Sequence, residues 1–465
     1  MLEVRKIKHE LTFDEVRELI NLHAHNQRRM MMLKDYYNGK SHALMYKERK
    51  TDGKSDNRVF FPFPYLITST LCGFMNIPPQ VRCEDTDIQE VIDDLFKYSD
   101  NPKQYSSELL DMSIMGVAVE QLYLDRKGIT RFKRINPIDI IVVKSSDIIG
   151  DIFCIIKHYE VDGIGEDREE YVELYYEEKI VRYYQNEKGI HSVTEEDNYF
   201  KDVPFCIYKN GEEMLGDFER VIDVIDGYSL YQSEILNATQ DITNALMLIS
   251  GCNLTDEQLR QVKNLRVLVD ENNIDAKMIY NEVNYDDAYA SQMRKNIFSL
   301  SSCVDLTDAE NVGNLSGSAL KTRLVNLLYL CSVKANYVKE AVLRRVELLL
   351  NIHSLTNAID VDEIIKNTVV DVNYNTLEDK TEMLNLVNGL RDVVSQETLL
   401  GLLDGIIISV DDELEKINKE KEESMKEFGF MQDMNGHLQS EEQPQEDEPQ
   451  EGETVDEEQE TVRQR

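Results

Sequence analysis

The chain has 465 residues, of which 42% are hydrophobic and 30% charged, a composition typical of a folded, soluble protein with two or three structural units. Its 51 basic and 88 acidic residues give a formal charge of −37, and the tail from Leu438 to Arg465, with 11 acidic and 2 basic side chains, accounts for −9 of it. The rest of the chain is therefore acidic in its own right. This argues against a broad nucleic-acid-binding surface, because such surfaces cluster Lys and Arg.

Cysteine spacing and hydropathy predict a cytosolic chain that does not enter a membrane. The seven cysteines stand at positions 72, 83, 154, 206, 252, 303 and 331. None of them forms a CxxC pair, so we expect reduced, buried thiols and no zinc site. The opening stretch MLEVRKIKHELTFDE is charged throughout, unlike a signal peptide. The apolar runs of the sequence are all too short to form a membrane-spanning helix.

Most of the first 115 residues are predicted to form helices. Apolar residues at near-helical spacing predict a helix over 10–38 that stops at Asn38-Gly39. The segment 40–64 is polar and then aromatic and proline-rich, so we expect it to be irregular or extended. Further helices are predicted to carry Leu66–Met75 and to occupy 86–115.

A change of period at Val117 predicts an antiparallel β unit over 116–216. Alternating residues replace the helical spacing there, and two polar, glycine-containing turns separate the alternating stretches. The turns are DRKG at 125–128 and NEKG at 186–189. The predicted strands lie at 117–123, 131–135, 138–144, 151–159, 169–176 and 179–185.

Helical spacing returns at Asp217 and dominates the rest of the chain. Apolar residues three or four apart predict a helix over 217–250 that stops at Gly251, a natural C′ residue. A shorter helix is predicted over 285–304. The stretch Ser318–Ile352 contains no Gly or Pro and predicts a helix of roughly 50 Å. A strand at 368–373, two or three helices within 376–428, and a disordered tail rich in Glu, Gln and Pro follow.

Two GKS tripeptides, Gly39-Lys40-Ser41 and Gly53-Lys54-Ser55, raise the question of nucleotide binding. A P-loop needs a glycine five positions before the second glycine, so that backbone N–H groups can wrap the phosphates. Lys34 and Glu48 occupy those positions, and neither tripeptide clearly follows a buried strand. Both are therefore interpreted as polar loops.

The sequence predicts no catalytic, metal-binding or cofactor-binding residues. His23 and His25 lack further ligands nearby and are interpreted as surface imidazoles. Adjacent carboxylates could suit a two-metal nuclease, but such pairs arise by chance among 88 acidic residues, and we place them at solvated helix ends. These pairs are Asp93-Asp94, Asp286-Asp287 and Asp411-Asp412.

The junction NLSGSALKTRLVNLL, residues 314–328, runs from a polar loop directly into the long predicted helix. One interpretation is a phosphate cradle, since the loop offers backbone N–H groups and a helix N-terminus. No lysine lies within the loop, and Lys321 comes one turn into the helix. The other interpretation is a flexible connector with Ser316 or Ser318 as N-cap. The absence of a lysine from the loop favours this second interpretation.

Five motifs, in order along 30–425, resemble the portal proteins of tailed double-stranded DNA bacteriophages, of the type common in phages of Gram-positive hosts. Each motif alone is weak, and their order makes the resemblance specific. They are Tyr36-Tyr37-Asn38-Gly39 with Asn57-Arg58-Val59; Gly116–Tyr123 with Ile135–Asp139; Val203-Pro204 with Gly216-Asp217-Phe218-Glu219; Asn314–Lys321; and Val394–Leu400 with Asp411–Lys416.

The resemblance implies an α+β, mainly helical subunit that forms a ring, of about twelve copies, around a central channel. The implied parts are 1–115 and 116–216 as the helical and β-rich parts of a wing, 217–251 and 285–305 as two stem helices, 252–284 as a clip, 306–317 as a tunnel loop, 318–375 as the long helix and return strand of the wing, 376–428 as a helical crown, and 429–465 as a disordered acidic tail. An acidic body agrees with a channel that repels phosphates instead of trapping them.

The resemblance also implies where DNA passes. The tunnel loop would be Asn311, Val312, Gly313, Asn314, Leu315, Ser316 and Gly317. Polar residues of the first stem helix, namely Ser233, Asn237, Gln240 and Asn244, could line the channel or simply face solvent, and the sequence leaves both open.

The implied partners are further copies of the chain, DNA, terminase, the major capsid protein and scaffold, and a head-completion or tail adaptor protein. The chain would belong to the virion, at a capsid vertex assembled in host cytoplasm, and would not be an enzyme. The alternatives are a metal-dependent nuclease or packaging ATPase, and a non-viral ring-forming scaffold.

Overall fold

The computed structural model describes residues 2–6, 9–50, 55–148, 150–162, 168–186, 189–242, 246–250, 255, 257, 275–279, 285–305, 317–375, 389–391, 394–401, 413–414 and 416–421. The chain divides into two compact units, Met1–Leu377 and Glu378–Arg465. In the second unit the structure describes helix α13 (Gln396–Gly401) and helical residues at 413–414 and 416–421. Among the described residues helix is the larger share and strand the smaller, which confirms the predicted mixture of helix and strand.

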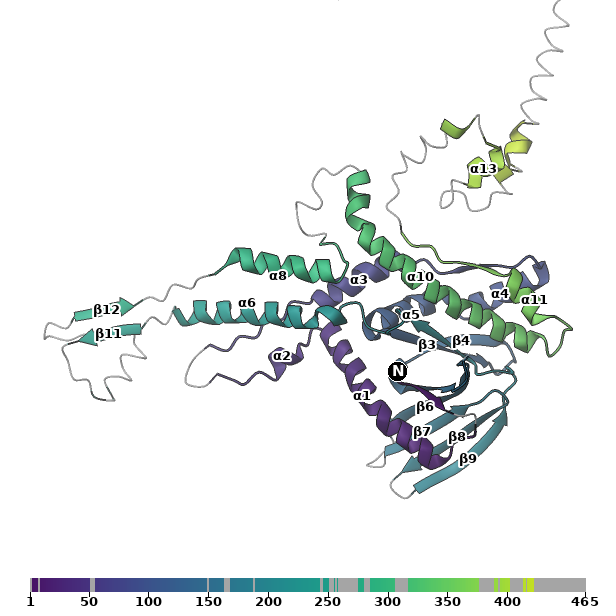
Figure 1. Cartoon of the computed structure of the whole chain (residues 1–465), viewed down its shortest axis with the longest axis horizontal. Coiled ribbons are helices and arrows are strands. Elements are labelled where there is room, and N and C mark those ends of the chain that lie inside the picture. The colour runs from purple at the N-terminus through teal and green to yellow at the C-terminus, as the bar shows by residue number, and fades with distance from the viewer. Residues whose placement is uncertain are drawn as a thin grey trace, which may run out of the picture. The chain divides into compact units, whose positions relative to one another are not determined.

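A six-stranded sheet lies at one side of the first unit (Figure 1), with strand order β1-β5-β6-β7-β8-β9. Its strands are β1 (Leu2–Lys6), β5 (Ile140–Ser145), β6 (Ile152–Asp162), β7 (Arg168–Tyr175), β8 (Lys179–Asn186) and β9 (Gly189–Asp197). Neighbours are antiparallel except for β1, which pairs in parallel with β5. Strand β1 precedes the first predicted helix and was not predicted, because its partner β5 is remote in the sequence.

A three-stranded sheet of order β10-β3-β4 packs against the six-stranded one. It contains β3 (Val117–Leu124), β4 (Thr130–Ile135) and β10 (Phe205–Lys209). One core joins the two sheets through buried residues such as Val119 and Phe205 from the smaller sheet and Val142 and Ile155 from the larger. The other face of the six-stranded sheet is covered by the N-terminal half of α1 (Phe13–Tyr37), through residues that include Leu19.

Helices cover the outer face of the three-stranded sheet. They are α3 (Phe63–Met75), α4 (Thr86–Tyr98), α5 (Asn101–Met115) and the long α10 (Gly317–His353). Helix α11 (Val361–Asn367) and the small sheet of β2 (Gln80–Arg82) and β13 (Val369–Asp371) lie beside α10. The remaining short elements are helix α2 (His42–Met45) after α1, the 3-10 turn η1 (Pro137–Asp139) between β4 and β5, and the 3-10 turn η2 (Glu219–Val221) after β10.

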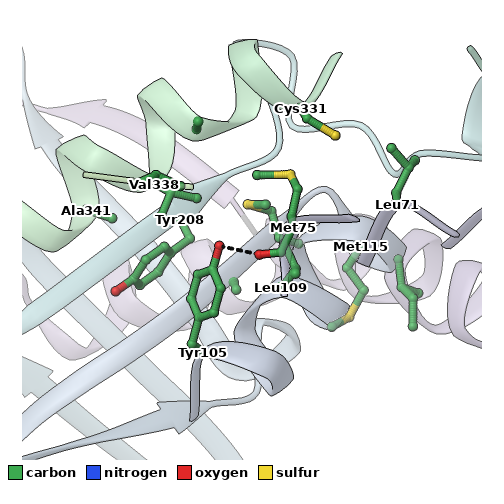
Figure 2. Close-up of a cluster of buried hydrophobic side chains, with 14 of the residues drawn as sticks. Leu71, Met75, Tyr105, Leu109, Met115, Tyr208, Cys331, Val338 and Ala341 are labelled. Carbon is green, nitrogen blue, oxygen red and sulfur yellow. Dashed lines mark hydrogen bonds between the residues drawn. The ribbon is translucent and has the colours of Figure 1, made fainter. Parts of the chain in front are cut away.

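The long helix forms part of the largest hydrophobic core. Figure 2 shows its buried residues Cys331, Val338 and Ala341 in one cluster with side chains of α3 and α5. In the same view the Tyr105 hydroxyl donates a hydrogen bond of 3.2 Å to the Met75 carbonyl, which ties α5 to the end of α3. The boundaries predicted for this helix, 318–352, are within one residue of those observed.

Two further helices, α6 (Ile222–Ile242) and α8 (Asp287–Leu300), run side by side (Figure 1). The predicted helix over 217–250 is wrong beyond Ile242, because Leu246–Ser250 forms strand β11, antiparallel to β12 (Asp275–Ile279). Its sequence, LMLIS, is a short continuous apolar run, which periodicity cannot assign to helix or strand.

Two glycines bring the end of α5 against the segment that leads into η2 and the helix after it. Gly116 adopts a left-handed φ of +83°, and a Cβ there would lie 1.9 Å from the Met214 carbonyl oxygen. A Cβ on Gly216 would lie 2.3 Å from the Ile114 carbonyl oxygen. Both positions therefore require glycine, and the two motifs that contain them, GVAVEQLY and GDFE, meet at this junction.

Candidate functional site: the long helix and the stem helix

The predicted tunnel loop leads directly into α10. Gly317 is the first residue of α10, which corrects its assignment to the loop, while Asn311, Val312, Gly313, Asn314, Leu315 and Ser316 lie outside the described residues. Because Gly317 is already helical, Ser318 stands inside the helix and cannot be its N-cap.

A ladder of side chains on α6 holds the segment 55–61. Four polar residues spaced four apart accept hydrogen bonds from alternate backbone N–H groups of that segment, which runs antiparallel to the helix. The pairs are Phe61 to Ser229 (3.4 Å), Val59 to Ser233 (3.0 Å), Asn57 to Asn237 (2.6 Å) and Ser55 to Asp241 (2.9 Å). Residues four apart lie on one face of a helix, and alternate residues of an extended chain point the same way, so the two periods match.

Two of the predicted channel-lining residues belong to this ladder. Ser233 and Asn237 are buried, and both pair with 55–61 within their own chain. Gln240 is exposed and accepts a 2.6 Å hydrogen bond from the Asn57 side chain, and Asn244 lies outside the described residues. The interpretation of Ser233 and Asn237 as solvent-facing is therefore wrong. Because Ser233 and Asn237 are buried within their own chain, a channel-lining role remains a prediction for Gln240 and Asn244.

Three further residues near the N-terminus contact α6 or the turn η2 before it. The Tyr36 hydroxyl donates to Asp226 at 2.6 Å, and the Ser41 hydroxyl donates to the same carboxylate at 2.7 Å. Ser41, the serine of the first GKS tripeptide, is also the N-cap of α2. Arg29 of α1 contacts Glu219 at the start of the stem region, with an Nε–Oε1 distance of 2.6 Å. These contacts give the tripeptide and the tyrosine motif a structural role.

A fully buried arginine fixes α10 to the β unit. Both carboxylate oxygens of Glu120 on β3 accept hydrogen bonds from Arg345, at 2.9 and 2.5 Å. Arg345 also donates to Asn101 at 3.1 Å and to the Tyr208 hydroxyl at 2.6 Å, and its guanidinium lies 3.9 Å from the ring centre of Phe132. Because the exposed fractions of Arg345 and Glu120 are 1% and 0%, the pair is shielded from water and from salt.

Glu108 of α5 is a second carboxylate in this cluster. Its Oε2 lies 3.6 Å from Arg345, but neither of its buried oxygens has a hydrogen-bond partner among the described residues. Burial, and then the charge of Glu120, raises the pKa of Glu108 well above its usual value. The arrangement therefore favours a protonated Glu108 beside the hydrogen-bonded Glu120–Arg345 pair.

We expect Glu108→Gln to remove a loss of stability that the wild-type chain suffers as the pH rises. An acid with a raised pKa keeps its proton in the folded state after the unfolded state has released it, so folding weakens from about pH 4.5 upward. The variant should match the wild type below that pH and become relatively more stable toward pH 8. Chemical denaturation across this range measures the difference, with the exposed Glu90→Gln on α4 as control. A Glu108→Gln variant less stable than the wild type at pH 8 would contradict the prediction.

A second buried ion pair joins the middle of α10 to the segment just before η2. Lys334 lies 2.5 Å from Asp217, and both side chains are almost completely buried. Asn210 donates to the same carboxylate oxygen at 2.7 Å. Burial raises the pKa of the neighbouring Cys303 thiol to about 12, so this thiol stays protonated and unreactive.

The histidines considered for metal binding do not form a site. His23 is buried, which corrects its interpretation as a surface imidazole: it contacts the Ile138 carbonyl oxygen at 2.8 Å, and burial lowers its pKa to about 4. His25 is exposed, as predicted. Among the described residues, no cluster of His, Cys, Asp or Glu could hold a metal ion.

The carboxylate pairs are also scattered. Asp286 caps α8 as predicted, whereas Asp93-Asp94 lie within α4 and not at its end. Asp411-Asp412 lie outside the described residues.

No described helix has the length and apolar composition to cross a bilayer.

Comparison with known proteins identifies the family to which the chain belongs. The family model described as phage portal protein, SPP1 Gp6-like, matches residues 17–427. Comparison with individual curated proteins gives no match. The matched segment contains every motif that carries the resemblance and covers most of the chain. The chain therefore belongs to the SPP1 Gp6-like family of phage portal proteins.

Proposed function

We propose that the chain assembles into a ring of about twelve subunits at one capsid vertex, and that double-stranded DNA passes through its central channel during packaging and ejection. The ring is proposed to dock terminase, the major capsid protein and scaffold, and a head-completion or tail adaptor protein. It is a structural part of the virion, assembled in host cytoplasm, and not an enzyme. Membership of the portal family carries this proposal.

The described contacts support a division of labour within the subunit. Buried ion pairs at Arg345 and Lys334 hold α10 to the β unit and to the stem entry, which suits a helix that must stay fixed while a loop at its N-terminus moves. We assign 116–216 and most of 1–115 to a wing, α6 and α8 to a stem, the region of β11 and β12 to a clip, and 376–428 to a crown.

The charge of the chain supports passage of DNA without capture. With a net charge of −37, the subunit repels phosphates at most of its surface, so a channel built from it would not bind DNA tightly. Of the residues proposed for the channel wall, Gln240 has an exposed side chain. The uncharged segment Asn311–Ser316, which precedes α10, is proposed to touch the passing DNA.

The ring itself is tested by electron microscopy of the purified protein together with its mass in solution. We expect round particles with a central hole and a mass about twelve times the 53.9 kDa of one chain. A ring with one subunit more or fewer would agree with the proposal. A stable monomer or dimer at high concentration would overturn it.

Shortening the tunnel loop tests its contact with DNA. Replacing Asn311–Ser316 by a shorter linker is expected to abolish most DNA packaging while rings still assemble, because the proposed loop would no longer reach the channel axis. A variant with the same loop residues in permuted order is the control, and it should retain packaging. Packaging at the wild-type level with the shortened loop would contradict the assignment.

A further inference from the structure

Between residues 322 and 336, the exposed side chains of α10 that the structure describes carry no charge. Tyr329 is 68% exposed, Val333 52% and Val325 37%. The exposed residues that the structure describes between 322 and 336 include no charged side chain, although 30% of the whole chain is charged. These residues are Thr322, Val325, Asn326, Tyr329, Ser332, Val333 and Asn336. We call Val325, Tyr329, Ser332 and Asn336, which lie on one line along the helix, the α10 stripe.

A second stripe of the same character lies on α8. Tyr289, Gln292, Asn296 and Leu300 are spaced three or four apart and are all exposed, Tyr289 at 51% and Leu300 at 62%. Gln292 donates a 2.9 Å hydrogen bond to Asn296, so the centre of this α8 stripe is a pair of linked amides. The charged residues of α8 lie off this line.

We propose that the α10 stripe of one subunit packs against the α8 stripe of the next subunit. The partner is a second copy of this chain, and the inference rests on the proposed ring. Two chains that each carry −37 repel each other over most of their surface, so the contact between them is expected where charge is absent. Exposed tyrosines within uncharged patches are also typical of the residues that dominate binding energy at interfaces.

The pairing of two different stripes is what a ring requires. A contact between identical patches closes a dimer, whereas a contact between two different patches of one chain adds subunits in one direction until the ring closes. Both stripes extend over three helical turns, roughly 16 Å at 1.5 Å per residue, so they can align along their full length. Each stripe contains an aliphatic residue and a tyrosine, together with amide or hydroxyl groups that can form hydrogen bonds across the contact.

Disulfide cross-linking of the full chain tests this contact. With the two stripes aligned, Asn296→Cys stands opposite Tyr329→Cys when the helices are antiparallel and opposite Ser332→Cys when they are parallel, so the double variant is made with each of these in turn. After oxidation of the matching double variant, we expect a ladder of covalent multimers up to the full ring on non-reducing gels. The wild type, with its native cysteines, sets the baseline. Tyr329→Cys paired with Lys295→Cys is the matched control, because Lys295 points about 100° away around α8 and should give no ladder.

The outcomes separate this inference from the proposed ring. Wild-type rings without a ladder in either double variant would overturn the stripe contact and leave the ring intact. Covalent dimers from Tyr329→Cys alone would show a contact between identical α10 faces and would also overturn it. A monomeric wild type would overturn both. In addition, Asn296→Glu should raise the concentration needed for half assembly by roughly tenfold, since it places a charge in the contact, and assembly at the wild-type concentration would contradict the proposal.

Discussion

Arg345→Met is expected to destabilise the folded chain by about 3–5 kcal/mol, because it leaves a buried carboxylate without its cation. Glu120 has an exposed fraction of 0% and forms two hydrogen bonds to Arg345. Methionine fills part of the space but offers no donor to Glu120 or to Asn101. Arg345→Lys should recover only part of the loss, because an ammonium group cannot reproduce the two parallel hydrogen bonds.

Chemical denaturation at fixed protein concentration measures this effect. The double variant Arg345→Met with Glu120→Gln should be more stable than Arg345→Met alone, since the second change removes the unpaired charge. Arg82→Met is the control, because Arg82 is 72% exposed and its ion pair with Asp371 should contribute less than about 1 kcal/mol. Equal losses from Arg345→Met and Arg82→Met would refute the idea that the buried pair fixes α10.

Gly116→Ala is expected to cost at least about 3 kcal/mol and to lower the yield of soluble protein sharply. Two effects add at this position. The left-handed backbone is strained for any residue with a Cβ, and the Cβ would lie 1.9 Å from a backbone oxygen that cannot move aside without displacing the entry to α6.

Gly128→Ala separates these two effects. Gly128, in the turn between β3 and β4, has a similar φ of +77°, but a Cβ there would meet no atom within 4 Å. This variant should therefore lose only about 1 kcal/mol, the cost of the backbone conformation alone. The difference between the two variants, measured by the same denaturation experiment, isolates the close approach of the chain segments. If both variants lose the same stability, the close approach does not matter.

Local patterns predicted the elements of this fold well where one signal dominated. The long helix α10 was predicted within one residue at each end, because its row of apolar residues runs without Gly or Pro. Strand β11 was missed because its consecutive apolar residues fit either period, and its pairing with β12 decides between them. Strand β1 was missed because its partner, β5, is remote in the sequence.

The buried ion pairs that fix α10 could not be predicted from the sequence, for a different reason. A charged residue in a helix is expected to face solvent, and nothing local marks Arg345 or Lys334 as buried. Their partners Glu120 and Asp217 are remote in the sequence, so only the tertiary structure brings the charges together. The polar stripe of α6 did carry a signal, namely Ser229, Ser233, Asn237 and Asp241 at intervals of four, but its acceptor role depends on the remote segment 55–61.

The ladder between α6 and segment 55–61 restricts how the stem helix can move. Its rungs repeat every four residues on the helix, about 6.0 Å, and every two residues on an extended chain, about 6.6 Å. An axial shift of α6 by a fraction of a rung would separate all four N–H donors from their acceptors at once, whereas rotation about the ladder would keep them paired. The ladder therefore opposes axial sliding of α6 more strongly than a pivot about this edge. An axial displacement of α6 would therefore be transmitted through these hydrogen bonds to the segment between α2 and α3.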